Sequence, residues 1–68
     1  MTEIMLVYMM VSVSPGVNEA RPFVRLKNGE YCELFSPLCT IQAEHDYGSA
    51  EVEQLRREVL NNWRKSHQ

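Results

Sequence analysis

The sequence predicts a small α+β domain: an antiparallel meander of three or four strands, followed by one C-terminal amphipathic helix packed on one face of the sheet. Two turn signals and one periodic segment favour this fold class. A Pro-Gly pair ends a long uncharged run near the N-terminus, and an Asn-Gly pair separates two further strand-like runs. The C-terminal segment carries apolar residues at helical spacing.

The first predicted strand covers residues 4–13, an uncharged run rich in residues that fit a pleated surface. Alternate residues of a strand point to opposite sides. One face carries Met5, Val7, Met9, Val11 and Val13. The other carries Ile4, Leu6, Tyr8 and Met10. A strand covered on one side only would alternate with polar residues, so this strand needs cover on both sides.

The first hairpin is predicted to turn at Pro15 and Gly16, which suit the two central positions of a type II turn. Residues 18–21 are polar and Pro22 lacks an amide donor, so we expect a sheet edge or an irregular segment there. The strand then resumes over residues 23–27. It leads into Asn28 and Gly29, a pair that favours a two-residue type I′ turn.

The type I′ turn would fix the register of the second hairpin. It pairs Lys27 with Glu30 and Val24 with Glu33. The hairpin face predicted to lie under the helix then holds Val24, Leu26, Tyr31, Phe35 and one acid, Glu33.

Ser36 and Pro37 are predicted to end the third strand. Residues 38–43 either form a short fourth strand or stay irregular. In a strand, the side chains of Cys39, Ile41 and Ala43 would point toward the core. Residues 44–48, which include the tripeptide His45-Asp46-Tyr47, are predicted to form a polar loop.

The helix is predicted over residues 50–65, with Ser49 as its N-cap. Acidic residues in its first turn and basic residues in its last turn match the helix dipole. Its apolar stripe consists of Val52, Leu55, Val59, Leu60 and Trp63. At about 1.5 Å per residue, this helix is long enough to cover one face of the sheet but not two.

A single helix leaves the second face of the first strand uncovered. Exposed apolar patches of this kind usually mark an interaction surface. We therefore expect a second copy, as a homodimer, or a partner protein to bury it, and the partner-binding candidates are Ile4, Leu6, Tyr8, Met10 and Phe23. The alternative is a half-barrel that buries both faces within the chain.

Arg56 falls inside the apolar arc of the helix, and Glu33 is the one acid on the facing hairpin surface. The sequence therefore predicts an ion pair between them, with the aliphatic part of Arg56 on the core. The remaining basic residues considered as contacts for phosphates or acidic partners are Arg25, Lys27, Arg57, Arg64 and Lys65.

Cys32 and Cys39 lack CxxC spacing and are predicted to be small, partly buried free thiols in a reducing compartment. The sequence contains no zinc-ligand spacing, nucleophile elbow or Gly-rich phosphate loop. We therefore expect no enzyme activity, no metal and no cofactor. No basic residue precedes the apolar run, which is too short to span a membrane, so a cytoplasmic location is expected.

The 68 residues form one small domain, residues 1–68, whose 44% hydrophobic content excludes disorder. We expect a non-enzymatic protein-binding module, a small regulator or stoichiometric inhibitor that occludes a partner's surface. Small, cofactor-free accessory proteins of bacteria and their phages often act in this way, which supports the expectation by analogy alone. The alternative is a small nucleic-acid-binding regulator that uses the helix arginines, although the net charge of −2 argues against it.

Overall fold

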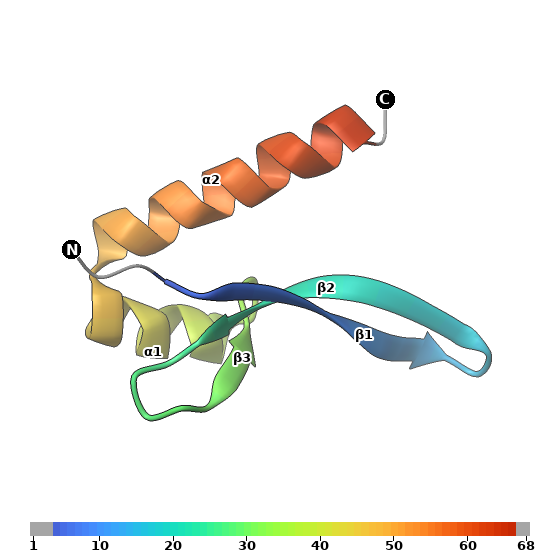
Figure 1. Ribbon diagram of the computed structural model, residues 1–68, viewed down its shortest axis with the longest axis horizontal. Coiled ribbons are helices and arrows are strands. Elements are labelled where there is room, and N and C mark those ends of the chain that lie inside the picture. The colour runs from blue at the N-terminus through green and yellow to red at the C-terminus, as the bar shows by residue number, and fades with distance from the viewer. Residues whose placement is uncertain (1–3, 67–68) are drawn as a thin grey trace.

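The protein consists of a three-stranded antiparallel sheet followed by two helices (Figure 1). The structure is a computed structural model and describes residues 4–66. Its elements are β1 (Leu6–Ser14), β2 (Val17–Arg25), β3 (Tyr31–Glu33), α1 (Pro37–Tyr47) and α2 (Ser49–Ser66). The strand order is β1-β2-β3. The predicted α+β class is confirmed, whereas the possible fourth strand and the single helix are replaced by two helices.

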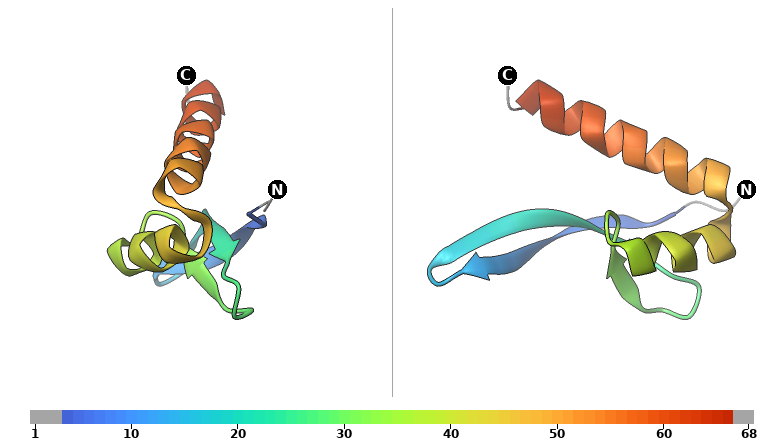
Figure 2. Two further views of the ribbon diagram at one scale, coloured as in Figure 1. Left: turned by 90° about the vertical axis from the view of Figure 1, so that its left-hand side faces the viewer. Right: turned by 180° about the vertical axis from the view of Figure 1, so that it is seen from behind.

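The β1–β2 hairpin is long and extends well beyond the rest of the molecule (Figures 1 and 2). Its base lies against β3 and the helices, and its tip points away from them. α2 begins beside the end of α1 and runs above the hairpin, in the direction of the hairpin tip, in Figure 1. The molecule is accordingly elongated, with principal extents of 37 × 26 × 18 Å.

The first hairpin turns where the sequence predicts. Ser14 pairs with Val17, and Gly16 has a φ of 78°, as the third position of a type II turn requires. β2 runs without interruption through Pro22, so of the two expected alternatives the irregular segment is wrong, while residues 17–21 do lie at an edge that β3 leaves unpaired. The Pro22 carbonyl accepts a hydrogen bond from the Leu34 N–H (3.0 Å) on the β3 side. Pro22 has no N–H, and an N–H at this position would point to that same side. The hydrogen-bond ladder between β1 and β2 therefore loses no bond.

The second hairpin differs from the prediction by one residue of register. Val24 pairs with Cys32 and not with Glu33. The Leu26 N–H donates to the Glu30 carbonyl (2.7 Å), which closes a three-residue loop. A type I′ turn needs positive φ at both central residues, but here only Gly29 has it (92°). The pair Asn28-Gly29 therefore ends a longer loop.

This shift reverses the two faces of β3, because neighbouring residues of a strand point to opposite sides. Cys32 and not Glu33 lies on the side of buried Val24, and Cys32 packs against the core. Tyr31, which was predicted to lie under the helix, is 44% exposed. Leu34, just after β3, is almost fully buried.

Helix α1 occupies the segment predicted as a weak strand and a polar loop. Pro37 takes its first position, where a missing N–H costs nothing, and the preceding Ser36 is extended. Cys39 and Ala43, one helical turn apart, are buried, whereas Ile41 is 67% exposed. A strand would have placed all three on one side.

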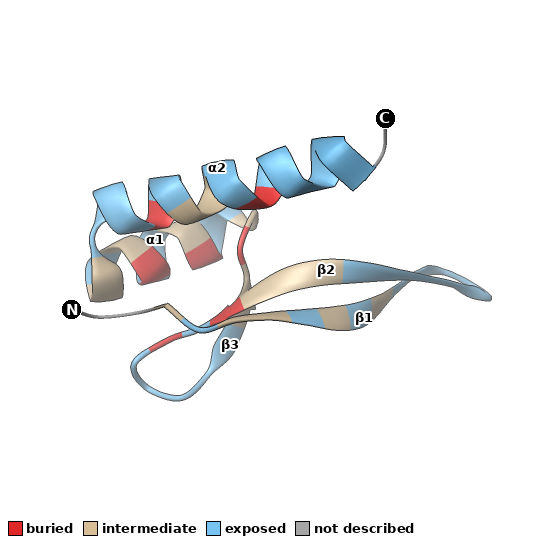
Figure 3. Cartoon of the chain, turned by 45° about the horizontal axis from the view of Figure 1, so that its top comes forward, coloured by how far each residue is buried: buried red, intermediate tan, exposed pale blue. Residues whose placement is uncertain are grey.

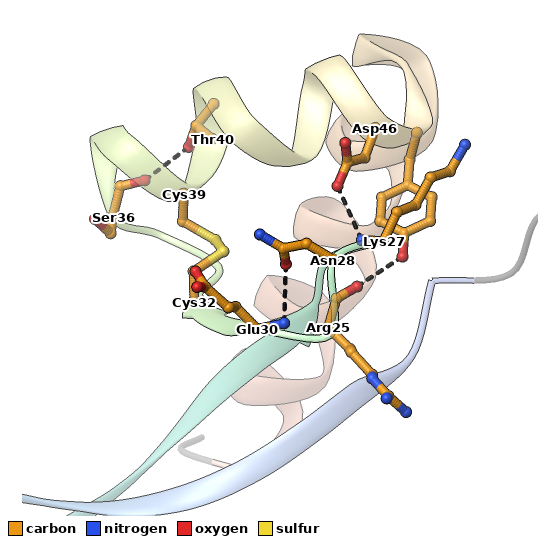
Figure 4. The surroundings of a disulfide bond; sticks show 10 residues. Arg25, Lys27, Asn28, Glu30, Cys32, Ser36, Cys39, Thr40 and Asp46 are labelled. Atoms are coloured by element: carbon orange, nitrogen blue, oxygen red, sulfur yellow. Dashed lines mark hydrogen bonds between the residues drawn. A yellow bond between two sulfur atoms is a disulfide. The ribbon is translucent and has the colours of Figure 1, made fainter.

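Both ends of α1 are attached to the sheet (Figure 4). Cys39 forms a disulfide with Cys32 of β3, so the prediction of two free thiols is wrong. In the last turn, the Tyr47 hydroxyl donates to the Arg25 carbonyl (2.6 Å). The neighbouring Asp46 carboxylate accepts the Lys27 N–H (3.0 Å). The predicted polar loop at residues 44–48 is thus an anchoring helical turn.

The prediction of a C-terminal helix is confirmed, with one correction at its start. Ser49 is the first helical residue and not the cap. Gly48 precedes it with a φ of 90°, and the Gly48 carbonyl accepts the Val52 N–H (3.2 Å). In the apolar stripe of α2, Val52 and Val59 are buried, while Leu60 is 43% exposed.

The core lies where the base of the hairpin meets the two helices (Figure 3). Its buried members come from β2, the loops on either side of β3, and both helices: Val24, Leu26, Leu34, Cys39, Ala43, Val52 and Val59.

Candidate protein-binding surface

An open groove lies between the outer part of the β1–β2 hairpin and the C-terminal half of α2. It has a volume of about 530 Å³. Most of its lining is apolar: Tyr8, Ala20, Pro22, Phe35, Val59, Leu60 and Trp63. The groove exists because α2 and the hairpin both continue past the last buried side chains. We call it the hairpin–helix groove.

One strand edge borders this groove. β3 pairs with β2 only from Phe23 to Arg25. Within the described chain, no strand pairs with residues 17–21 of β2 on that side. The bond from Leu34 to Pro22 shows that even-numbered residues of β2 direct their peptide groups there. The N–H and C=O groups of Asn18 and Ala20 therefore face the side left open by β3.

Charged side chains form one rim of the groove. Arg21 is hydrogen-bonded to Glu19 (3.1 Å) and to Glu33 (3.1 Å). These hydrogen bonds raise the pKa of Arg21 above its ordinary value, which already keeps a guanidinium charged at physiological pH. The rim combines a fixed cation with two carboxylates, each already paired.

The predicted ion pair between Glu33 and Arg56 is not formed. Glu33 pairs with Arg21, because the register of β3 turns Glu33 away from the helices. The Arg56 guanidinium lies over the Phe35 ring, 5.5 Å from its centroid. Arg56 is half-buried, as its position in the apolar arc suggested, but its contact is an aromatic face.

The residues predicted to bind a partner do not form one uncovered face. Ile4 and Leu6 pack against the core, because the helices cover the strand face that carries the even-numbered residues. Further along the same face, Tyr8 and Met10 are 57% and 66% exposed, since the hairpin extends past the core. Phe23 is half-buried on the opposite face. The outward face at the base of β1 is the odd-numbered one, contrary to the prediction.

The basic residues of the nucleic-acid alternative are not brought together. Arg25 and Lys27 contact the rings of Tyr31 and Tyr47, at 6.0 and 5.8 Å from the centroids. Arg57 is bonded to Glu53 (2.7 Å). The remaining two, Arg64 and Lys65, lie in the last turn of α2, at the opposite end of the molecule from the β2–β3 loop (Figure 1).

Several groove residues were not predicted as site residues. Leu60 and Trp63 were assigned to the core. The helical stripe shows which face of the helix is apolar, but not how far along the helix that face is covered by the sheet. Pro22 was interpreted only as a sign of a sheet edge or an irregular segment, and Phe35 only as part of the hairpin face under the helix, since their place in the groove depends on how far β3 extends along β2.

Within residues 4–66, no cluster of three or more His, Cys, Asp or Glu side chains is placed to hold a metal ion. Neither described helix combines the length and apolar character needed to cross a membrane. Comparison with known proteins gave no matching family model, no matching curated protein and no matching solved structure.

Proposed function

We propose that this protein is a non-enzymatic protein-binding module that takes up an extended apolar segment of a partner protein in the hairpin–helix groove. By covering that segment, it acts as a small regulator or stoichiometric inhibitor. The observation that carries the proposal is the coincidence of an open strand edge with an apolar helix wall.

Each part of the groove suits one part of an extended peptide. The peptide groups of Asn18 and Ala20 offer donors and acceptors for a strand that continues the line of β3. Such main-chain bonds supply affinity irrespective of sequence. The side chains of Leu60 and Trp63 on α2 supply apolar contacts, and aromatic residues are enriched at the centres of interfaces.

The chemistry of the groove also limits the partner segment. Its floor is apolar, so a charged side chain in the middle of the segment would be desolvated without a counterion. Arg21 and Glu33 lie on the rim, where polar ends of the segment can contact them while remaining hydrated. We expect a segment with alternating apolar residues and polar or charged ends.

A random-peptide library displayed on phage provides the test. Selection on the wild-type protein should enrich β-prone apolar peptides. The variant Leu60→Glu should weaken their binding at least about tenfold, because a carboxylate would be buried in the apolar wall. The control is Ile41→Glu, which places the same charge on the exposed outer side of α1, outside the groove.

The position of the peptide can be checked by amide chemical shifts. Binding should move the resonances of Asn18 and Ala20 and leave those of α1 unchanged. Equal binding by the Leu60→Glu and Ile41→Glu variants would exclude the groove as the site.

A cytoplasmic location remains a prediction, and the disulfide now bears on it. Cytosolic proteins seldom keep disulfides, which persist in oxidising compartments. Alkylation of intact cells followed by mass measurement would decide: a Cys32–Cys39 bond that stays unmodified points to an oxidising compartment.

A further inference from the structure

The outer edge of β1 is a second open strand edge, on the opposite side of the hairpin from β2. The Arg25 N–H donates to the Met5 carbonyl (3.1 Å), so odd-numbered residues of β1 direct their peptide groups toward β2. The peptide groups of the even-numbered residues therefore point away from β2, toward the open edge. These residues are Leu6, Tyr8, Met10 and Ser12. In the described sheet β1 is an edge strand, and nothing pairs with it on that side.

This edge lacks the features that normally keep strand edges from pairing. Proteins protect such edges by making them short or by placing charges, prolines or bulges on them. β3, the other edge strand, is only three residues long. β1 has nine residues without a charge or a proline, and its one irregularity, between Ser12 and Ser14, lies at the hairpin turn.

We infer that β1 pairs with β1 of a second copy of this chain, antiparallel and about a twofold axis at Met9. The two sheets then become one continuous sheet of six strands. A twofold axis of this kind is perpendicular to the sheet, so the helices of both copies lie on the same side of it. The inference does not depend on the hairpin–helix groove.

The sequence of β1 complements itself in this register. Tyr8 lies opposite Met10 of the second copy, and Val7 lies opposite Val11 of the second copy. Tyr8 and Met10 are 57% and 66% exposed in the single chain. In the dimer, each covers the other across the twofold axis, between the two copies of α2. Leu6 lies opposite Ser12 of the second copy, and no charge opposes another anywhere along the strand.

A second copy fits this edge better than a segment with charged residues would. The uncharged edge offers no counterion for a partner's acid or base, whereas β1 itself is uncharged and equally long. Pairing also satisfies the outward peptide groups of both chains at once, as a closed twofold interface requires.

The test measures molecular mass against concentration by sedimentation. The wild-type protein should approach twice its chain mass of 7.9 kDa as concentration rises. Met10→Pro removes an outward N–H that the bonds to β2 do not use, so the variant should fold and remain a monomer. Met10→Ala keeps that N–H and should still dimerise.

A cross-linking variant tests the register independently. Met9→Cys places two thiols directly opposite each other at the twofold axis, in a non-hydrogen-bonded pair whose Cα separation of about 4.5 Å permits a disulfide. Oxidation should give a covalent dimer. Val7→Cys, which lies opposite Val11 of the second copy, should give little.

Three outcomes would overturn the inference. These are a wild-type monomer at every concentration, a Met10→Pro variant that dimerises as the wild type does, and cross-linking at position 7 in preference to position 9. If Met10→Pro does not fold, the cross-linking result decides.

Discussion

The two ends of the molecule are built differently. At the closed end, the base of the hairpin, the loops on either side of β3, α1 and residues 49–59 of α2 contain every buried residue of the described chain, and a disulfide joins β3 to α1. At the open end, residues 8–22 of the hairpin and residues 60–66 of α2 have no buried side chain. The same two elements, the hairpin and α2, belong to both ends.

This difference separates stability from binding. The open end keeps its shape through the hydrogen bonds of a two-stranded ladder and of a helix, which fix the backbone and leave side chains exposed. A two-stranded hairpin is marginal on its own in water, so it depends on the closed end to hold its base. Substitutions at the closed end should therefore affect folding, and those at the open end should affect binding alone.

The largest effect is expected from Leu34→Ala. Leu34 is 1% exposed at the centre of the closed end, and its truncation leaves a cavity. Such changes cost about 2–5 kcal/mol. A domain of this size is stable by roughly 3–10 kcal/mol, so the variant should be partly or wholly unfolded in chemical denaturation experiments.

Met10→Ala is the matched control at the open end. Met10 is 66% exposed, so its truncation should change the free energy of unfolding of the monomer by less than about 0.5 kcal/mol. The free energy of unfolding should be measured at protein concentrations low enough to keep the chain monomeric. Similar losses for both variants would show that the two ends are not energetically distinct.

A somewhat smaller effect is expected from reducing the disulfide. The chain-entropy estimate for a loop that joins residues seven positions apart is about 2–3 kcal/mol. For a domain of this size that corresponds to a fall in Tm on the order of 10–20 °C. Thermal unfolding followed by circular dichroism, with and without reductant, would measure it.

The double variant Cys32→Ala/Cys39→Ala is the control, because reductant should not change its Tm. A shift of under about 2 °C on reducing the wild-type protein would mean that hydrogen bonds and apolar contacts hold α1 in place without the covalent bond.

The sequence predicts the open end better than the closed end, for a physical reason. Pro15, Gly16 and the uncharged, strand-prone run before them act locally, so the first hairpin follows from neighbouring residues. The length of α2 and, to within one residue, its start follow similarly from its periodic pattern and nearby charges. None of these features depends on a contact between distant segments.

The closed end depends on such contacts. Asn28-Gly29 suits a two-residue or a three-residue loop, and the choice between them decides which side chains of β3 face the core. The three-residue loop turns Cys32 toward the core, and Cys32 can therefore reach Cys39 on α1. The helix itself was obscured because its inward residues, Cys39 and Ala43, are small, while the larger Ile41 is 67% exposed. The groove could not be predicted for the same reason, since its limits are set by where β3 and the core end.

Among the changes at the closed end, the smallest effect is expected from Tyr47→Phe at its margin. The variant removes the hydroxyl that donates to the Arg25 carbonyl (2.6 Å) and keeps the ring that Lys27 contacts. A hydrogen bond of this kind contributes about 0.5–1.5 kcal/mol. Because the bond ties the last turn of α1 to β2, amide hydrogen exchange should accelerate there and in the β2–β3 loop, while the exchange rates of the hairpin tip stay as in the wild type. Faster exchange at the tip as well would mean that the two ends open together, and the division between a closed end that folds and an open end that binds would then fail.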